Sequence, residues 1–408
     1  MDSNAIFVYG FNKAYSSINL LFVLCLYLTV IISYLIFNKN NRISLSLYVL
    51  LLAYHTIISI IVYYNVWVAD SILYYNMAAS DEFVLYNIIE HYDIAFIYAL
   101  LSLLIHKLNL TFLSCTLIFS LVGFGGLILL YLAILDYLKL ENGKGTYLPY
   151  LLFYPSFSFW TGFAGKDAIL FFCLSLFLYS LVNIKKRFLF AIVALGLMLH
   201  VRPYICIIVS ISFLMAIFFS KDSAFITKYI LIFSVIGFLL LGRNFFIEKQ
   251  DIDIANIDQS QKGIGSTQGA WGGGSDIAIS NYNVPGKILS FLYRPLFFDA
   301  RSLTMVVSSF ENLLLLIISY CFFKLRFYKV IYSEKSLFVK FNLFYFVVAT
   351  TLLAYTNANL GTIVRKKIMV LISMLILVVI YYNKQKTLSV NIQTQIKQSD
   401  RNNPANLY

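Results

Sequence analysis

The chain is a succession of apolar segments, each long enough or nearly long enough to cross a membrane. A hydrocarbon core about 30 Å thick requires roughly 20 apolar residues per helix. Twelve segments meet or approach this length: 19–37, 43–64, 92–106, 110–136, 147–164, 167–183, 188–201, 204–220, 227–243, 302–325, 338–355 and 366–382. Because a backbone in lipid must satisfy its own hydrogen bonds, the pattern predicts an all-α polytopic membrane protein.

Composition agrees with this prediction and excludes several classes of function. The 408 residues are 60% hydrophobic and only 12% charged, too little charge to cover a soluble domain of this size. The five cysteines lie within apolar runs and the four histidines are scattered, so we expect no disulfide framework, no metal site and no cofactor. The net charge of +12 comes from basic residues between apolar segments, which indicates membrane orientation and no nucleic-acid binding.

Basic residues also predict which turns face the cytoplasm. Those at 185–187, at 324–335 and in the tail all favour the inside, as do Lys39 and Arg42 near the N-terminus. The sides predicted for the two halves of the chain are compatible only if one candidate segment does not cross the membrane. We assign 147–164 as that segment because prolines interrupt it.

The resulting topology has eleven crossings, within a range of ten to twelve, and an external N-terminus. It puts 16 of the 19 acidic residues outside, all except Asp222, Glu334 and Asp400. Residues 1–382 form one integral membrane domain, which includes a large external loop at about 244–300. Glycines in the first part of this loop favour mobility, and the polar cytoplasmic tail at 383–408 is expected to be disordered.

The charged residues near the external membrane edge are the candidates for function. The segment RPLFFDARSLTMVVSSFEN at 294–312 carries Arg294, Asp299 and Arg301 before an apolar run, with Glu311 inside it. Two guanidinium groups and a carboxylate suit a phosphate and a sugar hydroxyl, so we assign the first three residues to catalysis. The alternative is a structural ion pair between Arg294 and Asp299.

Two further motifs place cations outside, the side on which the positive-inside rule disfavours basic residues. NANLGTIVRKK at 357–367 presents Arg365 and Lys366 at the start of the last span, and LHVRPYI at 199–205 presents His200 and Arg202 between two short runs. We assign these four residues to substrate binding. Snorkelling at a helix end, or a proline kink, is the alternative in each case.

The remaining candidates are weaker. Lys166 opens a long apolar helix and is assigned to binding, whereas the helix dipole is sufficient to explain its neighbour Asp167. Asp70, in the first external loop, is a candidate general base or a helix N-cap. Arg243 binds substrate or simply marks the membrane edge, and Trp271 in the long loop is suited to stacking on a sugar, as is Tyr282.

The order and side of these motifs carry a family resemblance. FYPSFSFWTGFAGKDAILFF, then HVRP, RPLFFDARSLTMVVSSFEN and NLGTIVRKK, resemble bacterial surface-polysaccharide polymerases of the Wzy type, within the broader group of membrane glycan-assembly proteins with GT-C-like architecture. The resemblance covers about residues 60–370. It implies a polymerase of an O-antigen-like glycan in the bacterial inner membrane, with its active face in the periplasm. The growing glycan would leave undecaprenyl diphosphate and join the next lipid-linked repeat unit.

The resemblance also implies the partners and the alternatives. The lipid-linked oligosaccharide, the bilayer and a chain-length regulator protein are the expected partners. A GT-C glycosyltransferase that uses a polyprenyl-phosphate sugar is one alternative, and a flippase of lipid-linked oligosaccharide is another. Charges gathered at one face favour chemistry over transport, because a transporter needs charges along a central path.

Overall fold

A computed structural model describes residues 17–38, 42–65, 69–80, 92–140, 148–220, 282–300, 302–324, 327–356 and 359–401. Of these residues 87% are helical and none forms a strand, which confirms the predicted all-α class for the described part of the chain. The helices are α2 (Ser17–Phe37), α3 (Leu45–Asn65), α4 (Ala69–Ala79), α5 (Ile94–Leu108), α6 (Phe112–Leu138), α7 (Leu148–Leu152), α8 (Pro155–Thr161), α9 (Lys166–Val182), α10 (Ile184–Val201), α11 (Pro203–Phe219), α14 (Val284–Tyr293), α15 (Leu303–Lys324), α16 (Phe327–Ser333), α17 (Leu337–Thr356) and α18 (Leu360–Arg401).

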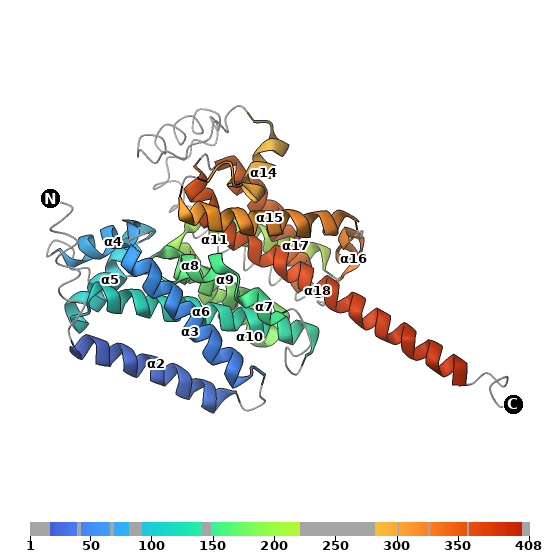
Figure 1. Cartoon of the computed structure of the whole chain (residues 1–408), viewed down its shortest axis with the longest axis horizontal. Helices are drawn as coiled ribbons and strands as arrows, with labels where there is room; N and C mark the ends of the chain where they lie inside the picture. The colour runs from blue at the N-terminus through green and yellow to red at the C-terminus, as the bar shows by residue number, and fades with distance from the viewer. Residues whose placement is uncertain are drawn as a thin grey trace.

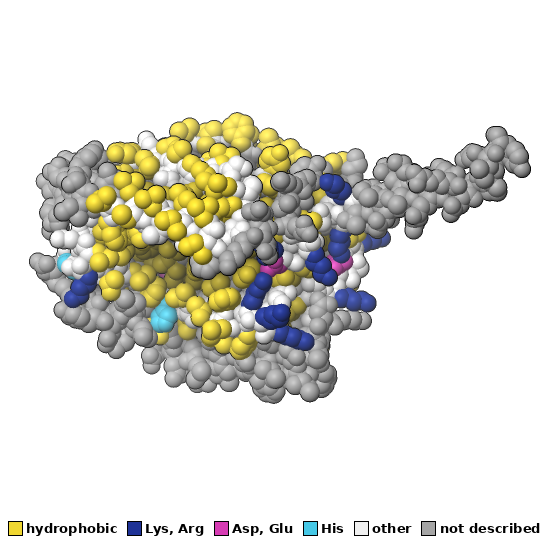
Figure 2. Space-filling model, turned by 90° about the horizontal axis from the view of Figure 1, so that it is seen from below, with side chains coloured by type: hydrophobic (Ala, Val, Ile, Leu, Met, Phe, Trp, Pro, Cys, Tyr) yellow, Lys and Arg dark blue, Asp and Glu magenta, His cyan; other side chains and the backbone are white. Residues whose placement is uncertain are grey.

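Within the described residues, four helices are long and apolar enough to cross a membrane: Leu45–Asn65, Phe112–Leu138, Leu303–Tyr320 and Leu337–Thr356. Shorter apolar stretches lie at Leu21–Ile36, Ile94–Leu108 and Pro203–Phe219. Hydrophobic side chains cover much of one face of the bundle, and Lys and Arg gather mainly toward the end from which α18 projects (Figure 2). These apolar helices indicate a membrane protein.

Ion pairs gather at two ends of the bundle of helices drawn in Figure 1. At one end, which we call the Asp167 end, the start of α9 meets the α10–α11 junction and the start of α18. At the other end, the Asp136 end, the carboxylate of Asp136 pairs with both Arg42 and Arg187. Helix α9 connects the two ends with 17 residues, a rise of roughly 25 Å.

The Asp136 contacts correct the predicted topology. Sequence analysis placed Asp136 outside and both of its arginine partners inside, and these placements are incompatible with the ion pairs. The chain between Asp136 and Lys166 therefore passes from one end of the bundle to the other through α7 and α8, a helix broken before Pro155. The segment assigned as non-crossing, 147–164, is the one that makes this connection.

Helix α5, by contrast, stays with α4 at the Asp167 end. Asp93, just before α5, pairs with Lys166 at the Asp167 end. At the other end of α5, the ring of His106 is hydrogen-bonded to the carbonyl of Ala78 in the short helix α4 (3.1 Å). Hydropathy alone did not distinguish 92–106 from 147–164. The sequence analysis made the predicted sides of the two halves agree by excluding 147–164, whereas these contacts favour excluding 92–106. The total of eleven crossings is unaffected by this exchange and stays a prediction.

Glycines allow the central helices to approach closely. A Cβ at Gly123 of α6 would lie 2.4 Å from the carbonyl oxygen of Thr161 in α8, and one at Gly126 would lie 2.6 Å from the Phe171 ring in α9. Small residues are typical of helix contacts in membranes because they let backbones pack closely. This packing fixes the start of α9, where the candidate site lies.

Two predictions for the polar segments also change. Helix α18 continues through Arg401 and projects from the bundle, whereas the tail after residue 382 was expected to be disordered (Figure 1). Its Lys- and Gln-containing sequence has good helix propensity, and an existing helix is easily extended. The end of the predicted external loop forms α14, which packs on α17 and puts Lys287 over the Tyr355 ring at 4.1 Å.

Candidate functional site

Asp167 lies at the centre of an ion-pair cluster at the bundle end named after it. The side chain is fully buried in the first turn of α9. Its Oδ1 is 2.9 Å from Nη2 of Arg202, and its Oδ2 accepts a hydrogen bond from Nε of Arg365. A buried charge is tolerated only when it is paired. Asp167 is therefore more than a first-turn residue that suits the helix dipole, and sequence analysis underrated it.

Two exposed carboxylates complete the pairs of this cluster. Nη1 of Arg365 donates to Oδ2 of Asp70 at 2.5 Å, and Nζ of Lys166 donates to Oδ1 of Asp93 at 3.0 Å. The side chains of Asp70 and Asp93 are 50% and 48% exposed, whereas those of Lys166 and Arg365 are 12% and 13% exposed. Arg365 thus pairs with both kinds of carboxylate, the buried Asp167 and the exposed Asp70, whereas Lys166 pairs with the exposed Asp93.

The guanidinium groups retain unused donors. Nη1 of Arg202 and Nη2 of Arg365 are buried and have no hydrogen-bond partner among the described residues. Buried donors without partners are unusual and call for an explanation, such as a missing water or ligand. Guanidinium donors of this kind match the oxygen atoms of an anion such as a phosphate.

Aromatic rings enclose the same cluster. The imidazole of His200 stacks on Tyr92 with ring centroids 4.6 Å apart, and Phe96 lies 5.5 Å away from it. The backbone carbonyl of His200 accepts a 2.6 Å hydrogen bond from the amide of Asp93. Nζ of Lys366 lies 5.4 Å from the centroid of the Tyr204 ring. His200 therefore holds the rim of the cluster through its backbone and its ring.

Arg294 and Asp299 form a second, neighbouring group. Asp299 accepts hydrogen bonds from Nε and Nη2 of Arg294 and from the Leu296 amide, and the pairing raises the pKa of the Arg294 guanidinium. The structural ion pair considered in the sequence analysis is therefore present. Nη1 of Arg294 also donates to the hydroxyl of Tyr282 at 3.4 Å.

Buried side chains clamp this loop to α18. Nζ of Lys367 donates to the carbonyl of Arg294 and to Oδ1 of Asn312, both at 2.8 Å. Nδ2 of Asn312 donates to the carbonyl of Pro295 at 2.7 Å. Since Lys367 follows Arg365 by two residues, the start of α18 contacts both groups.

Glu311 has a structural role that the sequence did not reveal. Its Oε1 accepts a 2.8 Å hydrogen bond from the backbone amide of Ser156, and its Oε2 accepts one from the Ser156 hydroxyl. Ser156 lies in the first turn of α8, whose own N-cap residue provides no side-chain hydrogen bond. Glu311 thus caps α8 from another helix, which satisfies a backbone group exposed by the break before Pro155.

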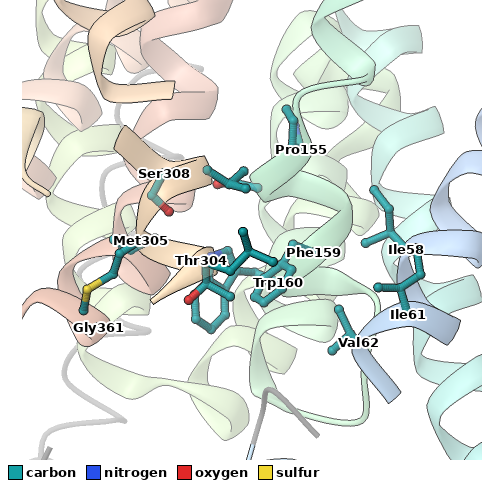
Figure 3. Close-up of a pocket in the computed structure, with 14 residues that line it drawn as sticks. Ile58, Ile61, Val62, Pro155, Phe159, Trp160, Thr304, Met305, Ser308 and Gly361 are labelled. Carbon is teal, nitrogen blue, oxygen red and sulfur yellow. The ribbon is translucent and has the colours of Figure 1, made fainter. Parts of the chain in front are cut away.

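An apolar cavity of about 240 Å³ lies between α3, α8, α15 and α18 (Figure 3). Ile58 comes from α3, Trp160 from α8, Met305 from α15 and Val364 from α18. Val364 directly precedes Arg365, so adjacent residues of α18 contact the cavity and the Asp167 cluster. The arrangement fits a molecule with an apolar part and an anionic part.

The structure brings most of the predicted site residues together. Contacts at the Asp167 end join Asp70, Lys166, His200, Arg202, Arg365 and Lys366, and the neighbouring group contains Arg294 and Asp299. Arg243, Trp271 and Arg301 lie outside the described residues.

Three contributors were missed by sequence reasoning. Asp167 was explained as a helix-dipole residue, Asp93 was not considered, and Lys367 was not assigned to the site. A carboxylate in the first turn of an apolar helix next to a lysine was the available signal for Asp167. No local pattern marks Asp93, whose partner Lys166 is 73 residues away.

The fold and the site define a helical membrane protein with a buried, partly unsatisfied cation cluster next to an apolar cavity. Comparison with known proteins adds no family, because no protein-family model, no curated protein and no solved structure matches the chain.

Proposed function

We propose that the chain is a polymerase of a bacterial surface polysaccharide. It transfers the growing glycan from undecaprenyl diphosphate to the next lipid-linked repeat unit, at the periplasmic face of the inner membrane. The observation that carries the proposal is the position of the Asp167 cluster beside the apolar cavity, with Arg365 and Val364 adjacent on α18. A polyprenyl chain fits an apolar cavity, and a diphosphate fits buried cations with unused donors.

The chemistry follows from this placement. The acceptor hydroxyl attacks the anomeric carbon of the growing glycan, and the bond from that carbon to the diphosphate oxygen breaks. Negative charge develops on the leaving diphosphate, where Arg202 and Arg365 stabilise it through donors that are already in position. Asp70, which is exposed beside Arg365, takes the proton from the acceptor hydroxyl. No metal is required, since the guanidinium groups balance the leaving charge.

Arg294 and Asp299 would then act on the acceptor side. Their loop is fixed to α18 by Lys367, two residues from Arg365. Asp299 already accepts three hydrogen bonds, so Asp70 is the better candidate for the base. A chain-length regulator protein remains an expected partner of such a polymerase.

Deletion of the gene tests the proposal. Electrophoresis of the surface glycan should show loss of the long-chain ladder, with a core carrying one repeat unit retained. Complementation with Arg202→Ala or Arg365→Ala should not restore the ladder, although Lys384→Ala, at the Asp136 end, should. Loss of even the single repeat unit in the deletion strain would indicate an earlier assembly step and overturn the proposal.

A GT-C glycosyltransferase using a polyprenyl-monophosphate sugar is the second candidate. Asp70 favours it, because this class places acidic residues in its first external loop and Asp70 lies at the cluster. The donor distinguishes the two candidates: a polymerase should use only the diphosphate-linked glycan, and the GT-C enzyme only the monophosphate-linked sugar.

A further inference from the structure

We propose that Asp70 and Asp93 are exchangeable counter-ions of the Asp167 cluster, which a diphosphate group replaces when it binds to Lys166, Arg202 and Arg365. The inference deepens the proposed function, because it describes how the same site receives its ligand. It predicts two carboxylates that hold the cations in position in the absence of a ligand and release them in its presence, which leaves Asp70 available to the acceptor hydroxyl.

Burial separates the three carboxylates into two kinds. Asp167 is fully buried and is held by two arginines, so its removal from the cluster would leave uncompensated charges. Asp70 and Asp93 are half exposed and each contacts one cation. Exposed ion pairs stabilise a protein little, and their carboxylates can exchange a cation for water at small cost.

The unused guanidinium donors show that the three aspartates do not saturate the cluster. Arg202 is 5% exposed, yet its Nη1 has no partner among the described residues, and the same holds for the buried Nη2 of Arg365. The fork-shaped guanidinium group matches phosphate oxygens, several of which can be contacted at once. A diphosphate can bring several oxygens into the cluster at once, whereas Asp70 and Asp93 each contribute one.

Charge balance also favours exchange. The cluster contains four cations, Lys166, Arg202, Arg365 and Lys366, and three carboxylates. A diphosphate brought in beside Asp70 and Asp93 would meet two like charges. If these two carboxylates release their cations, the incoming anion takes over their charge and the buried cations remain neutralised.

The backbone at Asp93 supports a functional role for this residue. Its φ of 57° and ψ of −119° are unfavourable for a residue with a side chain, and such conformations concentrate at functional sites. Two other non-glycine residues in the described part have positive φ, Asn109 and Lys139, and both are ordinary left-handed caps at helix ends. At Asp93 the conformation instead lets the amide bond to His200 while the carboxylate reaches Lys166.

The test is calorimetric titration of the purified full-length protein in lipid nanodiscs with inorganic pyrophosphate. Asp93→Asn and Asp70→Asn remove one competing negative charge each and keep the side-chain size, and asparagine tolerates the positive φ at residue 93. Each variant should bind pyrophosphate about tenfold more tightly than the wild type, equivalent to about 1.4 kcal/mol. Glu334→Gln is the matched control: it removes a carboxylate that pairs with Lys384 away from the cluster, and should leave the affinity unchanged.

Unchanged or weaker pyrophosphate binding in folded Asp93→Asn and Asp70→Asn proteins would overturn the inference. Unfolding of both variants would overturn it as well, because exchangeable counter-ions contribute little to stability. Titration with inorganic phosphate should show a smaller gain than pyrophosphate, and an equal gain would assign the site to a single phosphate group. Tighter pyrophosphate binding with an intact glycan ladder in the deletion strain would support the exchange and reject only the polymerase function.

Discussion

At the residue scale, the account depends on the difference between buried and exposed carboxylates. Asp167 balances two buried arginines, whereas Asp70 meets one of them from solvent. Arg365 and Asp167 are 198 positions apart, so their partnership could not be deduced from local sequence. The sequence did single out Arg365, because three cations predicted on the disfavoured side of the membrane are an exception to the positive-inside rule.

This difference predicts unequal effects of alanine substitution. Asp167→Ala leaves two buried guanidinium groups without their shared carboxylate, and should lower the free energy of unfolding by about 3–5 kcal/mol. Asp70→Ala removes an exposed partner and should cost at most about 1 kcal/mol. Denaturant titration of the two purified variants measures both values. Equal losses of stability would show that Asp167 is not the organising residue of the cluster.

At the scale of the helix, hydropathy located most elements well and could not distinguish two of them, 92–106 and 147–164. The runs predicted at 19–37 and 43–64 correspond to α2 (Ser17–Phe37) and α3 (Leu45–Asn65). Such runs can be recognised in the sequence because a bilayer requires a certain length and an apolar composition of each helix. Hydropathy did not identify the broken α7–α8 segment as one that connects the two ends. The backbone amide of Ser156 at its break is hydrogen-bonded by Glu311, a residue 155 positions away.

Helix contacts predict opposite signs for two glycine substitutions. A Cβ at Gly123 would lie 2.4 Å from the Thr161 carbonyl, whereas a Cβ at Gly196 meets nothing within 4 Å. Gly123→Ala should therefore destabilise the protein by about 1–3 kcal/mol through overpacking. Gly196→Ala should stabilise it by up to about 1 kcal/mol, because alanine favours the helix. Thermal unfolding in detergent compares them, and the same sign for both would refute the close α6–α8 contact.

At the scale of the whole molecule, the two polar ends define an axis across the bundle. Contacts place Asp136 with Arg42 and Arg187 at one end, and Asp93 with Lys166 at the other. The positive-inside rule predicted opposite sides for Arg42 and Lys166, which do lie at different ends, and the side that each end faces stays a prediction. The rule could not decide whether α5 or α7–α8 is the segment that does not cross the membrane. It requires only that one candidate be excluded, and either exclusion gives the same total.

Cysteine labelling decides between the two topologies. In a cysteine-free background, Lys107→Cys lies in the last turn of α5 and Lys139→Cys lies at the C-cap of α6. The structure predicts that a membrane-impermeant thiol reagent added from the periplasm labels position 107 and leaves position 139 unlabelled. Hydropathy with 147–164 excluded predicts the reverse. Lys186→Cys, beside Arg187, is the control and should behave like position 139.

The central claim is that the Asp167 cluster is where a diphosphate-linked glycan reacts, and in vitro polymerisation tests it most directly. The purified protein in nanodiscs would receive the undecaprenyl-diphosphate-linked repeat unit isolated from the deletion strain. We predict products with two or more repeats, formed about 10²- to 10³-fold more slowly by a folded Arg365→Ala variant, because a positioned donor to the leaving group is lost. Product formation at the wild-type rate by that variant, or from a monophosphate-linked sugar in place of the diphosphate-linked unit, would contradict the account.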